Sequence, residues 1–166
     1  MAMFREYITD SGLVAITATG LTGPLLYFST PATADGNISK IKVFVEAGAA
    51  APVIPANSSV AFTVNKVTGT KAGGAAVTPN PIGPVALASN LTASSGSTAI
   101  TGLTQSTELW EGSCSLVPGS GQPDDDPNTG QEIYMGVSGQ FAVYGSVPAG
   151  PGAPTVSLRV VTWHAE

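Results

Sequence analysis

The chain has 166 residues, of which 43% are hydrophobic and only 10% are charged, against roughly 25% charged residues in a typical soluble domain. Eleven acidic and six basic side chains give a net charge of −5, so the sequence offers no basic surface for nucleic-acid phosphates. No stretch approaches the roughly 18 apolar residues of a membrane helix, and the first residues lack the basic and apolar segments of a secretory signal. We therefore expect one domain, made in a cytoplasm, without nucleic-acid or membrane partners.

Glycine and proline divide the chain into short segments, and no helical period survives for three turns. The first three expected strands cover residues 5–9, 13–19 and 24–28. The clearest strand covers residues 38–47, where Ile41, Val43 and Val45 share one face. Residues 60–67 repeat this alternation. One face of that strand is expected to carry Val60, Phe62, Val64 and Lys66.

Two segments rich in small residues separate the strong strand patterns. Residues 48–59 are expected to form a loop. Residues 68–101 contain few large apolar side chains, so they can bury little surface to offset the entropy of ordering. Pro79, Pro81 and Pro84 have no N–H to donate to a central strand. We therefore predict that residues 68–101 form a low-complexity, extended surface excursion.

Four further strands are expected near the C-terminus, at residues 108–117, 132–137, 140–147 and 156–164. Gly112 in the first of them indicates a bulge. The whole pattern predicts an all-β domain spanning residues 1–166, a β-sandwich or jelly roll of about eight to ten short antiparallel strands with long extended loops. Residues 1–10 are a candidate N-terminal arm.

The residues that could carry catalysis lack the partners that catalysis needs. His164 is the only histidine, and nothing in the sequence pairs it with a nucleophile and an orienting acid. Cys114 is the only cysteine, and it is expected to be a small buried hydrophobe. The glycines around Lys71 lack the Gly-Lys-Ser/Thr order of a phosphate-binding loop, so we interpret them as a flexible turn.

An acidic loop gives the only metal-like pattern. Asp124, Asp126 and Asn128 place oxygen atoms at alternate positions, as at the start of a calcium loop. Such a loop also needs glycine at its sixth position and glutamate at its twelfth, and these positions hold Thr129 and Met135. A solvated acidic loop is the favoured interpretation, and we predict no cofactor.

Several segments resemble small virion proteins of tailed bacteriophages. They are Phe4 to Tyr7, the strands at 38–46 and 60–70, the turn Val147-Pro-Ala-Gly, and the final strand from Val156 to Glu166 with its closing Trp163. The resemblance implies a capsid decoration or cement protein with a jelly-roll-like fold that often forms trimers. It implies a position on the capsid surface, with the major capsid protein as the partner.

From this resemblance and the weakly charged composition, we expect a non-enzymatic subunit that stabilises a phage head by binding between capsid subunits and assembles as a homotrimer. Its extended segments would add strands to neighbouring sheets. The predicted interface residues are Phe4, Tyr7, Pro79, Pro81, Pro84, Trp110 and Trp163.

Two alternatives remain open. A tail or head-fibre component would present Trp110 and the acidic loop to a host surface glycan. A β-sandwich glycoside hydrolase would need two carboxylates roughly 5–9.5 Å apart, and Glu108, Glu111 and Glu132 are its candidates.

Overall fold

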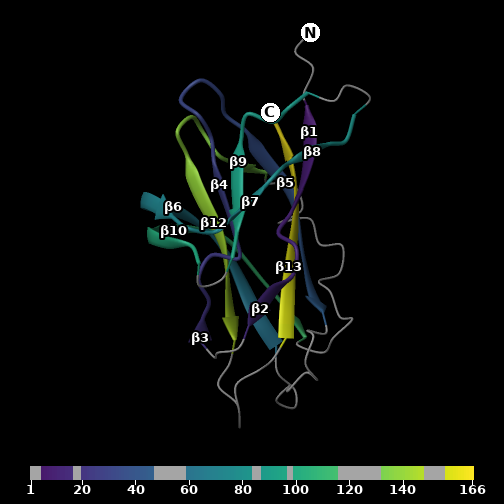
Figure 1. The fold of residues 1–166 in the computed structure, drawn as a ribbon, viewed down its shortest axis with the longest axis vertical. Coiled ribbons are helices and arrows are strands. Elements are labelled where there is room, and N and C mark those ends of the chain that lie inside the picture. The colour runs from purple at the N-terminus through teal and green to yellow at the C-terminus, as the bar shows by residue number, and fades with distance from the viewer. Residues whose placement is uncertain are drawn as a thin grey trace.

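A computed structural model of the chain describes residues 5–16, 20–46, 59–83, 87–96, 99–115, 132–147 and 156–166. These residues form thirteen strands and no helix. Figure 1 shows the two sheets that the strands build, and all their pairings are antiparallel. The predicted all-β sandwich is therefore confirmed.

Sheet A contains six strands. They are β1 (Glu6–Asp10), β2 (Val14–Ile16), β5 (Asn37–Glu46), β8 (Asn80–Pro81), β11 (Ile133–Tyr134) and β13 (Val156–Ala165). Their order is β11-β5-β13-β1-β8, and β2 pairs with β13 beyond the end of β1. β1, which lies within the predicted N-terminal arm, is thus an inner strand of this sheet.

Sheet B contains seven strands. They are β3 (Gly20–Leu21), β4 (Leu26–Ser29), β6 (Ser59–Ala72), β7 (Ala75–Val77), β9 (Thr92–Ser95), β10 (Thr101–Ser115) and β12 (Gln140–Val147). Their order is β10-β6-β12-β4-β9-β7, and β3 pairs with β12. The paired ends of β6 and β10 lie together at the left of Figure 1.

The main core lies between the two sheets and follows the alternation of the sequence. Ile41, Val43 and Val45 of β5 are fully buried, as the sequence predicts. On β6, Val60, Phe62 and Val64 are also fully buried, whereas Lys66 on the same face is exposed. Lys66 is the last β6 residue that pairs with β12, so this lysine lies where the sandwich ends. Each large apolar side chain in this core contributes about 1.5–3 kcal/mol.

A second, smaller core lies on the other face of sheet B. Tyr27 and Ala142 are cross-strand partners, and their sequence neighbours on β4 and β12 face the main core instead. The buried members of the second core are Tyr27, Val67, Ile100, Ala142 and Tyr144. Leu103 packs against them. Because β6 and β10 supply Val67 and Leu103 beyond the point where β12 ends its pairing, the second core holds these strand ends against the sheet.

Residues 68–101 do more than run over the surface. They contain β7, β8 and β9, and β9 lies inside sheet B between β4 and β7. β6 turns into β7 through two glycines with positive φ, and a Cβ at Gly73 would overlap the carbonyl oxygen of Ala99. Pro81 lies on β8, an edge strand of sheet A, as expected for a residue without an N–H.

Two other predicted segments differ from the structure or lie outside it. The predicted strand 108–117 corresponds to β10, which begins seven residues earlier, at Thr101. The predicted loop 48–59 lies outside the described residues except for Ser59, the first residue of β6.

Candidate functional site

β10 forms a long, exposed edge of sheet B among the residues that the structure describes. Among the described strands β10 is the longest, and within the described residues its only strand partner is β6. Of its fifteen residues, Cys114 alone is buried. Nine of the eleven residues from Thr101 to Glu111 are exposed, and the other two, Leu103 and Trp110, are half-buried. Because a strand in an antiparallel pair bonds its neighbour with only half of its backbone groups, the other half of the β10 groups faces outward.

Two bulges set the direction of the β10 side chains. Ser106 and Leu109 are extra residues on β10 and have no partner position on β6. The residues on either side of each one pair with two β6 residues that are adjacent in sequence. The bulge at Leu109 lets Glu108 and Glu111 pair with Asn65 and Thr63, which lie on one face of β6. In a regular strand, residues three apart would point to opposite faces. The bulge thus places both carboxylates on the outer face of sheet B.

The same bulge directs Trp110 toward the interior. Trp110 pairs with Val64 and packs, half-buried, against the main core. Cys114, the next core-facing large side chain of this edge, is 7% exposed. Burial raises the pKa of its thiol to about 11, so the thiol is neutral at physiological pH. The expectation that Cys114 is buried is confirmed. Trp110 stabilises the edge strand, so its substitution will affect stability as well as any assembly.

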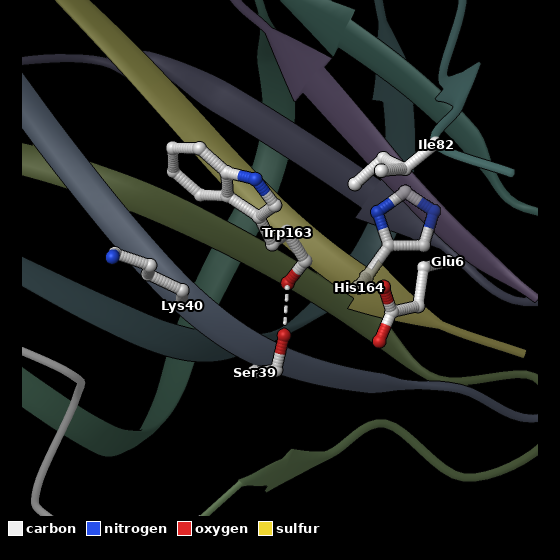
Figure 2. Close-up of a pocket in the computed structure, with 6 residues that line it drawn as sticks. All are labelled: Glu6, Ser39, Lys40, Ile82, Trp163 and His164. Carbon is white, nitrogen blue, oxygen red and sulfur yellow. Dashed lines mark hydrogen bonds between the residues drawn. The ribbon is translucent and has the colours of Figure 1, made fainter.

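A pocket of about 190 Å³ lies at one end of sheet A. Its lining residues are Glu6, Ser39, Lys40, Ile82, Trp163 and His164. In the view of Figure 2, Trp163 and Lys40 lie on one side of the pocket, and Glu6, Ile82 and His164 lie on the other. The Ser39 hydroxyl donates a 3.3 Å hydrogen bond to the Trp163 carbonyl oxygen. The Lys40 ammonium lies 5.5 Å from the centroid of the Trp163 ring.

His164 is buried and faces the interior. Its ring stacks on Tyr7 at 5.3 Å between centroids and contacts the edge of Phe28 at 6.0 Å. Neither ring nitrogen has a hydrogen-bond partner, and the nearest carboxylate oxygen, on Glu166, is 3.9 Å from Nε2. Burial lowers the pKa of His164 to about 4, against a smaller opposing effect of Glu166, so the imidazole is neutral at pH 7.

The predicted interface residues are scattered over the fold. Tyr7 is internal, because β1 lies between two strands and its inward side chain stacks on His164. Pro79 is buried and Pro81 is exposed. Trp163 is half-buried and lines the pocket. Phe4 and Pro84 lie outside the described residues, as do the three calcium candidates Asp124, Asp126 and Asn128.

The other candidate groups have ordinary structural surroundings. The Lys71 ammonium donates hydrogen bonds to the Gly73 carbonyl at 2.8 Å and to the Ser94 hydroxyl at 3.1 Å, and these bonds stabilise the turn after β6. The exposed glutamate Glu132 accepts a 2.8 Å bond from the Asn37 amide. The described ranges contain no group of three or more His, Cys, Asp or Glu residues that could hold a metal ion. Within the same ranges, no helix is long and apolar enough to span a membrane.

Two polar contacts join distant parts of the chain and were not anticipated. Arg159 binds Asp10 through Nε at 3.0 Å to each carboxylate oxygen and through Nη2, and this guanidinium lowers the pKa of the Asp10 carboxyl. The Glu166 carboxylate accepts bonds from the Asn90 and Leu91 amides and from the Ser89 hydroxyl. Neither contact could be predicted from the sequence, because the residues that form it are far apart along the chain.

Comparisons with protein-family models, curated proteins and solved structures found no match to this chain.

Proposed function

We propose that this chain is a structural protein of a tailed-bacteriophage virion, a decoration or cement subunit that assembles as a homotrimer and binds between subunits of the major capsid protein on the outside of the head. The observation that supports an assembly role is the open edge of β10. The segments that resemble phage virion proteins support the particular particle. The proposed role is binding without turnover.

The edge of β10 is suited to accept a strand from a partner. From Thr101 to Thr107 it carries no charged side chain, and the first charge is that of Glu108. Natural proteins usually protect such edges with lysine, proline or a covering segment. A neutral, exposed edge with unpaired backbone groups is instead the surface used in β-augmentation. Many such contacts on one particle would hold a subunit firmly even if each is weak, because dissociation requires them all to open together.

Solution mass and capsid binding test this proposal together. Light scattering should give a mass three times that of one chain, and the purified protein should sediment with phage heads assembled without it. A lysine in the edge, Thr104→Lys, should lower the affinity for heads about tenfold or more, because a charged side chain blocks close strand pairing. Thr78→Lys is the matched control, since Thr78 is exposed between β7 and β8.

Each outcome has a definite meaning. A monomer that does not bind heads overturns the proposal. If Thr104→Lys and Thr78→Lys reduce the binding to heads by the same factor, the β10 edge has no special role in that binding. Circular dichroism of both variants verifies that they fold. Loss of binding confined to Thr104→Lys supports both the function and the edge that performs it.

A further inference from the structure

The pocket at the end of sheet A owes its shape to an irregular strand pairing. Along β5 and β13, Lys40 pairs with Trp163, and the next pair is Ile38 with His164. Ser39 is therefore an extra residue on β5 with no partner position on β13. Its hydroxyl donates a hydrogen bond to the Trp163 carbonyl oxygen. On the other side, β1 contributes Glu6, and the segment after β8 contributes Ile82.

The charges in the pocket favour a neutral ligand. Glu6 supplies one carboxylate and Lys40 one ammonium, so an anion would meet the carboxylate and a cation would meet the ammonium. One carboxylate is also too few for a calcium or magnesium site built from protein oxygens. A purely apolar ligand would take Glu6 and Ser39 out of water without hydrogen bonds in return.

The remaining surfaces favour a ring with both apolar and hydroxyl groups. Trp163 and Ile82 offer apolar surface, and Ile82 is 48% exposed. Glu6 and Ser39 offer oxygen atoms that accept hydrogen bonds from hydroxyls. The volume of about 190 Å³ equals about six water molecules at roughly 30 Å³ each. This space suits a single ring of hexose size and is below the roughly 300–1,000 Å³ of sites for larger ligands.

The His164 ring contributes no hydrogen bond to a ligand in this pocket. Both ring nitrogens are buried, and the ring packs on Tyr7 and Phe28 in the interior. Trp163, its neighbour on β13, points to the opposite face of the sheet and is half-buried.

We propose that this pocket binds one neutral sugar unit, with the apolar face of the sugar against Trp163 and its hydroxyls on Glu6 and Ser39. This site is separate from the β10 edge and does not depend on the assembly role. It also differs from the glycan surface expected from the sequence, because Trp110 packs against the main core.

The two tryptophans allow a direct test. Trp110→Phe leaves Trp163 as the only tryptophan, so its fluorescence reports the pocket. This variant is titrated with methyl glycosides of a neutral hexose, a deoxyhexose and an N-acetylhexosamine, and with short oligosaccharides of each. We expect a saturable change in emission with a millimolar dissociation constant for at least one sugar. Adding Glu6→Gln should weaken that binding about tenfold, because Glu6 is exposed and its loss removes a charged acceptor without disturbing the core.

Glu46→Gln is the matched control, since Glu46 lies at the other end of β5, opposite Ser157, and removes the same charge outside the pocket. The proposal is overturned if no sugar in the panel produces a saturable change. It is also overturned if Glu6→Gln and Glu46→Gln bind the sugar equally well, because the sugar would then occupy another site. Binding of the oligosaccharide and the matching monosaccharide with the same affinity would confirm that one sugar unit fills the pocket.

Discussion

The sole histidine provides the sharpest test of the packing. Its pKa is about 4 in the folded chain and about 6.5 when exposed. Between these values the unfolded chain binds a proton that the folded chain does not, so the stability must fall as the pH falls. At about 1.4 kcal/mol per pH unit, the loss from pH 7 to pH 4 is about 3 kcal/mol. Below the folded pKa, this group causes no further loss.

His164→Phe isolates this contribution. Phenylalanine keeps a flat ring against Tyr7 and Phe28 but cannot bind a proton. We expect the free energy of unfolding, measured by urea denaturation from pH 7 to pH 4.5, to fall less steeply in the variant than in the parent, by up to about 1.4 kcal/mol per pH unit. Since no other histidine is present, NMR titration of the imidazole gives its pKa directly. A measured pKa near 6.5, or equal slopes for the two proteins, would refute the reasoning.

Three further predictions concern the turn after β6 and the two long-range polar contacts. Gly73→Ala should cost about 1–3 kcal/mol in a urea unfolding experiment, because the positive φ and the Ala99 carbonyl leave no room for a Cβ; Gly83→Ala, with open space around it, should change little. Glu166→Gln should cost about 1–2 kcal/mol, because the carboxylate accepts several hydrogen bonds, and hydrogen exchange at the two loop amides it binds should speed up; unchanged exchange would contradict this contact. Asp10→Asn should cost at most about 1 kcal/mol, because the side chains of Asp10 and Arg159 are 34% and 42% exposed. Since the folded pKa of Asp10 is lowered from its ordinary value of 3.8, this contribution is fully present above pH 3.8 and is lost as the pH falls through the folded pKa. The difference in stability between variant and parent is therefore expected to be full at pH 7 and to shrink as the pH is lowered below 3.8.

The strands with strong alternation could be predicted from local sequence. Residues 140–147 were predicted as a strand with the bounds that β12 has, and 156–164 differs from β13 by one residue. In these segments the alternation of apolar and polar residues fixes which face of the strand is buried, because apolar side chains at every second position all lie on one face.

The buried threonines show where that rule stops. Thr9 and Thr162 are fully buried cross-strand partners. A hydroxyl residue at an alternate position fits either a solvent face or an interior one, and only the neighbouring sheet decides between them. The same holds for His164, whose position near the end of the sequence gave no sign that it would lie under Tyr7 and Phe28.

The candidate sites depended on tertiary structure still more. The bulge at Leu109 places Glu111 on the same face as Glu108 and directs Trp110 toward the core, and it is visible only in the pairing of β10 with β6. The extra residue Ser39 shapes the pocket in the same way. The sequence alone determined that this chain is an all-β protein with a single cysteine and a single histidine and little charge. Only the tertiary structure decided which strand edge stays open and which side chains share a pocket, because both depend on pairings between residues far apart in the chain.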